Sequence, residues 1–152
     1  MGGNAKICTI VVAALVDTNI LVYRFDARTP AKQARAIELI DRRIDEESLR
    51  IAYQSVIEFH AAVTKAFGGR KPLLDSVDAR HETEELLFEF DVVFPTESIV
   101  RTALRGVATY QLSWFDALIW AHAEESGLEH LISEDFQHDR LYGTVRVVNP
   151  FL

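Results

Sequence analysis

Residues 11–21 read Val-Val-Ala-Ala-Leu-Val-Asp-Thr-Asn-Ile-Leu. The valine-rich apolar run before Asp17 predicts a buried parallel strand, because such strands are covered on both faces and show no alternation of polarity. The carboxylate at the end of the run predicts a ligand site, since open α/β sheets bind ligands at the carboxyl ends of their strands. Asp17 is equally compatible with a simple turn, because Asp, Thr and Asn are all common where strands end.

The length of 152 residues predicts a single domain, residues 1–152, with one core. Cys8 is the only cysteine, which excludes an internal disulfide and a thiolate metal cage and favours a reducing, cytoplasmic compartment. The apolar run Ile7–Val16 is too short to cross a bilayer and leads into Asp17 without a cleavage site of small residues. We therefore expect the first strand there, with a few surplus residues in front, and no membrane association.

The formal net charge of −7 argues against a protein that binds nucleic acid by charge alone, because phosphates are normally bound by Lys and Arg. It does not exclude a nuclease. Carboxylates around metal ions count as negative in the sequence, but the bound cations offset them and attract phosphate.

The rest of the chain alternates between strand and helix patterns, which is typical of α/β proteins. Further strands are predicted at residues 49–53, 90–94, 131–133 and 145–148, and helices at 30–44, 55–67, 73–88, 96–110 and 113–126. The expected fold is a three-layer α/β structure in which helices flank a central parallel sheet of four to five strands. The helices at 55–67 and 73–88 are expected to form a helical hairpin on one side of the sheet.

Apolar spacing also predicts which side of each helix faces the core. The predicted inward residues are Ala34, Ile37, Leu39, Ile40 and Ile44; Phe59, Ala62, Val63 and Phe67; Val77, Leu86, Leu87 and Phe88; and Ile99, Val100, Ala103, Leu104 and Val107. Trp114 and Trp120 are interpreted as core residues rather than platforms for stacking bases.

Four carboxylates stand where these elements would direct them to one place: Asp17, Glu58, Asp116 and Asp135. Clustered carboxylates repel one another, so a fold that gathers them usually shares hard cations among them, and Mg²⁺ or Mn²⁺ with oxygen ligands is the natural choice. Such ions hold a phosphodiester, acidify the attacking water and stabilise the leaving oxygen.

Each acid also has a purely structural interpretation. Ser55-x-x-Glu58 and Ser113-x-x-Asp116 both fit a capping box, in which the acid bonds back to the backbone amide at the helix start. Asp135 is compatible with a turn after Ser133. The coincidence of all four acids with the end of the first strand favours a site.

Residues 16–21 read VDTNIL, 55–59 read SVIEF, 114–119 read WFDALI, 131–137 read LISEDFQ and 149–151 read NPF. Together and in this order, these segments resemble the PIN domain, and more narrowly the VapC-type toxins of bacterial toxin–antitoxin pairs. The resemblance extends from Leu15 to Phe151. No single segment is decisive for the resemblance, but the segments taken together and in this order are specific.

The resemblance implies a parallel sheet between helices and Mg²⁺- or Mn²⁺-dependent cleavage of RNA. Matched by position, the acidic quartet of the family is Asp17, Glu58, Asp116 and Asp135. Asn19 and Ser133 match polar positions that orient the acids or a water on the metal. The family further implies a small antitoxin that inserts a side chain or helix near the acids, and a homodimer formed through the helical side.

The chain departs from the family after Gln137-His138, where relatives tend to have glycine and this chain has Asp139. Asp139 is interpreted as a solvated loop residue rather than an extra acid facing the metal. His138 is the histidine nearest in sequence to Asp135, so whether it joins the site is left open.

Three other residues near the acids in sequence were weighed for function. His60 and His122 lie on predicted helices, where histidines are usually structural. Arg24 closely follows Asp17 and is the first candidate for a contact with substrate phosphate.

The leading hypothesis is a metal-dependent endoribonuclease toxin that cuts structured RNA, such as tRNA or rRNA, and leaves a 5′-phosphate and a 3′-hydroxyl, as the resemblance implies. A phosphatase with Asp17 as nucleophile is an alternative, but such enzymes generally need a second Asp where Asn19 stands. A receiver-like signalling domain needs an acidic pair before Asp17 and a late lysine, and neither is evident. A non-catalytic PIN-fold module that binds RNA or protein is the third interpretation.

Overall fold

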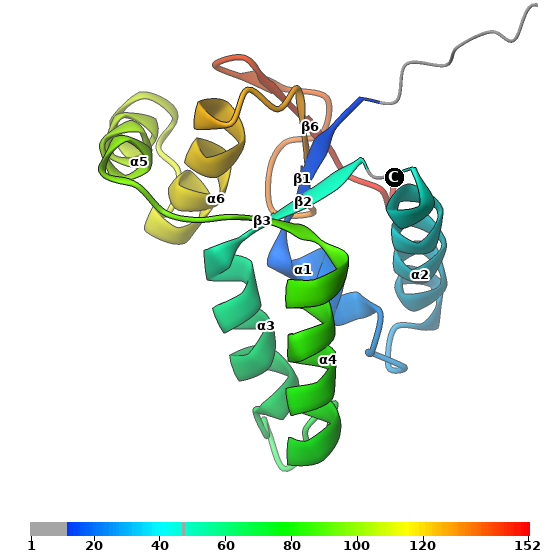
Figure 1. Cartoon of the computed structure of the whole chain (residues 1–152). Coiled ribbons are helices and arrows are strands. Elements are labelled where there is room, and N and C mark those ends of the chain that lie inside the picture. Colours follow the sequence, from blue (N-terminus) through cyan, green and yellow to red (C-terminus); the bar gives the residue numbers. More distant parts are fainter. Residues whose placement is uncertain (1–11, 47) are drawn as a thin grey trace, which may run out of the picture.

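The computed structural model describes residues 12–46 and 48–152. Within this part of the chain, six strands form one sheet with helices against both faces (Figure 1). The strands are β1 (Ala14–Val16), β2 (Leu49–Ala52), β3 (Asp91–Val93), β4 (His130–Ile132), β5 (Leu141–Tyr142) and β6 (Val145–Val148). The helices are α1 (Thr18–Tyr23), α2 (Pro30–Asp45), α3 (Tyr53–Thr64), α4 (Ser76–Glu89), α5 (Glu97–Tyr110) and α6 (Trp114–Glu125).

The strand order is β3-β2-β1-β4-β6-β5, which places β1 near the centre of the sheet. Val16 at the end of β1 lies opposite Ile51 of β2 and Ile132 of β4, and all three strands are parallel. Only β5 and β6 pair in the antiparallel direction. Because parallel strands end at the same edge, the residues after β1 and β4 come side by side, and Asp17 N donates to Ile132 O at 2.9 Å.

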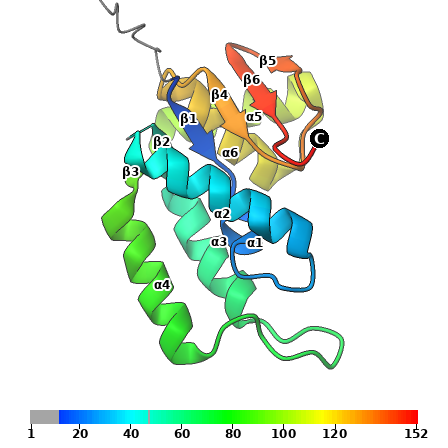
Figure 2. The ribbon, with the colours of Figure 1, turned by 90° about the vertical axis from the view of Figure 1, so that its right-hand side faces the viewer.

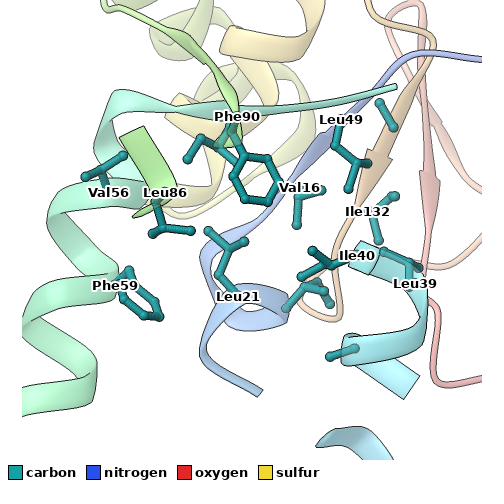
Figure 3. Packing of buried hydrophobic residues seen from close by; sticks show 14 of the residues in the cluster. Val16, Leu21, Leu39, Ile40, Leu49, Val56, Phe59, Leu86, Phe90 and Ile132 are labelled. Atoms are coloured by element: carbon teal, nitrogen blue, oxygen red, sulfur yellow. The ribbon is translucent and has the colours of Figure 1, made fainter. Parts of the chain in front are cut away.

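The sheet is buried on both faces. In β1, Ala14 and Val16 contact the core formed with α1–α4, whereas Leu15 contacts the core formed with α5 and α6. All three side chains have an exposed fraction of 0%. Figure 3 shows the first core, where side chains of the sheet meet those of the helices: Val16, Ile132, Leu21, Ile40 and Phe59 are among them. The prediction of a parallel sheet between helices is confirmed.

Several helices begin as local chemistry dictates. Pro30 occupies the first turn of α2, where its missing N–H costs nothing. Thr96 caps α5 by accepting from Ile99 N at 3.2 Å. Within the described ranges, no helix combines the length and the apolar character needed to cross a bilayer.

The helical hairpin of α3 and α4 is present. The two helices pack against each other, and Figure 2 shows the loop that joins their lower ends extending to one side. The loop covers residues 65–75.

Some element predictions were wrong. Helix α1 was not among the predicted helices, because its six residues are too few to show a helical period. Strand β5 has two residues and no pattern at all. Helix α3 begins at Tyr53 and ends at Thr64, two and three residues before its predicted limits, since β2 leads into it without a loop. Cys8 and the surplus residues expected before the strand lie outside the described residues.

The predicted inward faces were too wide. The side chains that are exposed instead are Ala34, Ile37, Ala62, Phe67, Val77, Leu87, Phe88, Val100, Leu104 and Val107. The core prediction was also wrong for Trp114, which is 40% exposed, whereas Trp120 is buried as predicted. A helix that packs on a sheet buries a narrow stripe, so a broad apolar stripe leaves part of itself in solvent. In α5, for example, Ile99 and Ala103 are buried while Leu104 is 56% exposed.

Candidate functional site

A cavity of about 410 Å³ opens at the carboxyl ends of β1 and β4. All four carboxylates predicted from the sequence are among its lining residues, which are Asp17, Thr18, Asn19, Val22, Tyr23, Asp26, Gln54, Glu58, Ala62, Phe115, Asp116, Ile119 and Asp135. The acids come from four separate places in the chain. Within the described part of the chain, the lining contains five carboxylates, counting Asp26, and neither Lys nor Arg.

Asp17 is the most buried of the four acids, with an exposed fraction of 4%. One carboxylate oxygen, Oδ1, accepts from Thr18 N at 2.7 Å and so caps α1. The other, Oδ2, accepts from Ser133 Oγ at 2.6 Å. The turn and the site interpretations of Asp17 are therefore compatible, because the same carboxylate caps α1 and lines the cavity.

Burial raises the pKa of Asp17 to about 7. The hydrogen bonds from Ser133 and Thr18 act in the opposite direction, and the negative charges of Asp135 and Asp116 raise the pKa further. At neutral pH this carboxyl group thus ionises only in part unless a positive charge is brought to it.

Glu58 lies in the second turn of α3 and is half-buried. Its Oε2 accepts from Thr18 Oγ1 at 3.1 Å, and its Oε1 accepts from Gln54 Nε2 at 2.6 Å. The capping-box interpretation is wrong here, because α3 starts after Ala52 without a side-chain cap and Ser55 is fully buried inside the first turn. Glu58 is therefore oriented by neighbours in the cavity.

Asp116 lies in the first turn of α6. Ser113 does cap this helix, with its Oγ accepting from Asp116 N at 3.3 Å. Burial raises the pKa of Asp116, a hydrogen bond with Ser113 lowers it, and the charge of Asp135 raises it. A helix cap and a carboxylate directed into the cavity thus coexist at this position.

Asp135 follows β4 and is exposed at the mouth of the cavity. Its Oδ2 accepts from Asn19 Nδ2 at 2.9 Å, and its backbone N donates to Ser133 Oγ at 3.1 Å. Two polar side chains therefore connect the acids: Ser133 joins Asp17 to the Asp135 loop, and Asn19 holds the Asp135 carboxylate.

The donor set suits a hard divalent cation. Among residues 12–46 and 48–152, Asn19 Oδ1 is buried without a hydrogen-bond partner and the Asp17 carboxyl group has no positively charged neighbour. The carboxylates of the lining offer oxygen as the ligand atom. Among the described residues, no three His, Cys, Asp or Glu side chains already stand close enough to hold an ion together. Glu58 and Asp135 are instead held by Gln54 and Asn19. The oxygen ligands favour a cation. Binding one requires the side chains of Glu58 and Asp135 to change rotamer.

The other candidates from the sequence lie outside the cavity lining. Arg24 places its guanidinium 5.6 Å from the centre of the Phe25 ring. His60 Nδ1 bonds to Thr83 Oγ1 on α4. His122 is buried, with its Nδ1 bonded to Leu118 O and its pKa lowered by burial.

Asp139 is a loop residue, as expected. It is exposed, its carboxylate accepts from Arg146 Nη1 at 3.0 Å, and it adopts a left-handed φ of 61°. Glycine adopts this left-handed conformation without strain, and Asp is among the few other residues that tolerate it. His138 accepts from Asn149 N and stays away from the cavity.

Sequence reasoning missed Asp26, an acid at the far end of the cavity. It is 7% exposed and forms a two-pronged ion pair with Arg28, at 2.6 and 2.8 Å, which lowers the pKa of Asp26. The Asp-x-Arg spacing in a predicted turn could have indicated the ion pair of Asp26 with Arg28.

A second network beside the cavity was also missed. Tyr23 OH donates to Glu134 Oε2 at 2.6 Å, and Lys32 forms an ion pair with Glu134. The ammonium of Lys32 lies 4.8 Å from the Tyr23 ring centre. These contacts hold the loop that carries Asp135, and nothing local in the sequence indicates them because they join residues more than 100 positions apart.

Comparisons with known proteins agree with this architecture. A family model described as PIN domain matches residues 14–143. The chain is similar to a toxin–antitoxin complex from Klebsiella pneumoniae, with 24% identity and a TM-score of 0.63 over 91% of this chain and 98% of that one. It is also similar to FitAcB from Neisseria gonorrhoeae, with 19% identity and a TM-score of 0.65 over 91% and 98%.

A third similar structure is VapC20 of Mycobacterium tuberculosis, described as a sarcin–ricin loop cleaving toxin. The identity is 16% and the TM-score 0.57, over 81% of this chain and 92% of that one. Among curated protein sequences, none matches the chain.

Proposed function

The chain belongs to the PIN-domain family, and on this premise we propose that it is a metal-dependent endoribonuclease that hydrolyses phosphodiester bonds in structured RNA such as tRNA or rRNA. One observation carries the proposal. Four carboxylates from distant parts of the sequence line a single cavity to which the described residues contribute no Lys or Arg, and the most buried of the four has a pKa raised to about 7. Such a cavity repels a phosphodiester unless cations are bound in it.

Asp17, Glu58, Asp116 and Asp135 are the proposed ligands of Mg²⁺ or Mn²⁺. When bound, the cation neutralises phosphate charge and makes water more acidic. Hydrogen bonds from Thr18 N and Ser133 Oγ hold the Asp17 carboxylate in one orientation, so it can bind the cation without rearranging. Loss of the Asp17 proton then accompanies binding of the cation, and affinity for the cation rises with pH.

We further propose that the protein is a VapC-type toxin whose partner is a small antitoxin. The similar structures from Klebsiella pneumoniae and Neisseria gonorrhoeae support this, since the first is described as a toxin–antitoxin complex and matches nearly the whole chain. The proposed site of action is the cytoplasm, where tRNA and rRNA are found.

A homodimer is also proposed, formed through an apolar face beside the cavity. This face combines a cleft of about 440 Å³ with exposed apolar side chains of α3, α5, α6 and the loop after β3; its members are Tyr53, Ile57, Phe94, Val100, Leu104, Trp114 and Phe115. Contiguous exposed apolar surface on this scale marks a protein interface. A second copy of the chain is the proposed occupant.

The phosphatase alternative has less support. Both oxygens of the Asp17 carboxylate accept hydrogen bonds, and a nucleophile that is 96% covered offers poor access to phosphorus. The non-catalytic alternative stays distinct, because it predicts RNA or protein binding without cleavage.

The test is cleavage of a mixed tRNA and rRNA pool by the purified protein with Mg²⁺, with Mn²⁺ and with a chelator. We expect discrete cuts with 5′-phosphate ends only when metal is present. Asp17→Asn removes the buried charge at nearly constant shape and should abolish the cuts. Asp41→Asn, an exposed acid on α2, is the matched control and should cut normally.

Cutting that persists in chelator, or in Asp17→Asn, contradicts the metal-dependent mechanism. Intact RNA in every sample, together with no binding of Mn²⁺ in a calorimetric titration, favours the non-catalytic interpretation.

A further inference from the structure

The loop between α3 and α4 has an unusual charge for this chain. Residues 59–74 contain no Asp or Glu, although the chain has 23 of them and a net charge of −7. The same segment contains Lys65, Arg70 and Lys71. None of these three cations takes part in the salt bridges found among residues 12–46 and 48–152. The tip of the hairpin, residues 65–71, is therefore a small basic patch.

The tip has a defined conformation. Phe67 and Arg70 form an antiparallel bridge, with Arg70 N donating to Phe67 O at 3.0 Å. Gly68 and Gly69 between them have φ of 57° and 74°, the left-handed pair that a tight primed turn requires. At its base the loop is fixed by Leu74, whose N donates to Val63 O at 3.0 Å and whose side chain packs against the core.

The turn presents an aromatic side chain together with its cations. Phe67 is 75% exposed, and Lys65 Nζ lies 6.0 Å from the ring centre. All residues from 65 to 72 are exposed. An exposed aromatic ring among cations is the combination that binds single-stranded nucleic acid, because each base offers a π-face and each linkage a negative charge.

The tip lies at one end of the acidic cavity. Ala62, three residues before Lys65 on α3, belongs to the cavity lining, and so does Asp26. Arg70 is close enough to Asp26 to lower its pKa, after the larger effects of Arg28 and of burial. The hairpin tip and this end of the cavity are therefore neighbours, and Figure 2 shows the loop between α3 and α4 at the lower end of the two helices.

We propose that residues 65–71 form an RNA-docking arm that binds an unpaired stretch of the substrate beside the cleaved bond. In this arm, Lys65, Arg70 and Lys71 contact phosphates, and Phe67 stacks on one base. The inference rests on the proposed ribonuclease function. In this proposal the hairpin binds the RNA and the carboxylates take part in its cleavage. This division explains how an acidic protein binds an anionic substrate. An acidic protein segment would match the cations but would leave the ring of Phe67 without a stacking partner.

The experiment measures binding of a fluorescein-labelled 20-nucleotide oligouridine to the Asp17→Asn protein with Mg²⁺, by anisotropy between 50 and 200 mM NaCl. In this background, Lys65→Gln/Arg70→Gln/Lys71→Gln should weaken binding at least tenfold and reduce the salt slope by about 2, at roughly 0.7 per single-strand phosphate contact. The matched control, Arg42→Gln/Arg80→Gln/Arg140→Gln, removes three exposed or lightly held cations elsewhere and should change binding less than threefold.

The role of the ring is tested separately. Phe67→Ser should weaken binding about tenfold, the scale of one base–aromatic stack, and Phe67→Trp should restore it. A hairpin triple variant that binds like the control triple, or a Phe67→Ser variant that binds like the parent, overturns the proposal. Unchanged binding of oligouridine combined with lost binding of labelled polyglutamate reassigns the tip to an acidic protein partner.

Cleavage kinetics test the docking arm separately from the proposed ribonuclease function. With Asp17 intact, the hairpin variants should raise KM about tenfold and leave kcat within twofold. Cleavage with an unchanged KM refutes the docking arm and leaves the ribonuclease standing. Absence of any cleavage by the unmodified protein refutes the ribonuclease, and the oligouridine titration then still decides whether the arm binds nucleic acid.

Discussion

Replacing Asp17 by Asn should stabilise the protein in the absence of metal. The folded state raises the pKa of this carboxyl from 3.8 to about 7, so the folded chain binds more protons than the unfolded chain between these values. Stability due to this group is therefore present at low pH and is lost as the pH rises from about 4 to about 7. At 1.36 kcal/mol per pKa unit the total loss is about 4 kcal/mol, and about 2.5 kcal/mol of it falls between pH 5 and pH 8.

The assay is urea unfolding in EDTA at half-unit steps between pH 5 and pH 8, followed by circular dichroism. The Asn side chain is neutral throughout, and it can still accept from Thr18 N and face Ser133. We expect Asp17→Asn to gain about 2.5 kcal/mol relative to the unmodified protein across this range. The difference between the two curves isolates Asp17, because the opposing effect of His122, whose pKa is lowered, is common to both proteins.

Two outcomes refute the reasoning. One is an unmodified protein whose free energy of unfolding stays level from pH 5 to pH 8 relative to Asp17→Asn. The other is a failure of Mn²⁺ at pH 8 to stabilise the unmodified protein more than the variant, since a cation that binds the folded Asp17 carboxylate should recover the lost free energy. Asp41→Asn serves as the control and should follow the unmodified protein.

Three further substitutions test other parts of the structure. Gly106→Ala should lower the free energy of unfolding by about 1–3 kcal/mol, because its Cβ would lie 2.6 Å from the buried ring of Trp120, and a urea midpoint at or above that of the parent would contradict this packing. Leu104→Glu, at a residue that is 56% exposed, should turn the proposed dimer into a monomer with little loss of stability; light scattering during gel filtration checks this, and an unaltered mass argues against that interface. Lys32→Met should raise the pKa of Glu134, since burial raises that pKa and the bonds from Lys32 and Tyr23 outweigh burial and lower it. Carbon NMR titration of the carboxyl follows this pKa, and an unmoved value means that Lys32 does not hold the loop.

The acids at strand ends were the most predictable part of the site. Asp17 and Asp135 follow apolar strands, and parallel strands of one sheet end at one edge, so their convergence needs no knowledge of distant contacts. Glu58 and Asp116 were harder, because Ser-x-x-acid is a pattern that caps and sites share.

The structure shows that Ser55 and Ser113 differ in their position relative to the first residue of their helices. Ser113 is the true cap of α6, whereas Ser55 lies inside α3 and is buried, since that helix starts directly from β2. A shift of two residues in a helix start is beyond what local pattern resolves. The exposed apolar stripe of α5, with Leu104, was unpredictable for another reason: spacing reveals an apolar face but not whether the sheet or another molecule covers it.

The hydrogen bonds that complete the cavity join residues 116 positions apart, from Ser133 to Asp17 and from Asn19 to Asp135. Contacts at such separation form slowly, because a long loop must close before they can be made. During synthesis, Asp17, Glu58 and Asp116 all leave the ribosome before β4 exists to pair with β1. A nascent chain therefore lacks the assembled carboxylate cluster, and under the proposed ribonuclease function we expect no RNA cleavage until the central strand pair has closed.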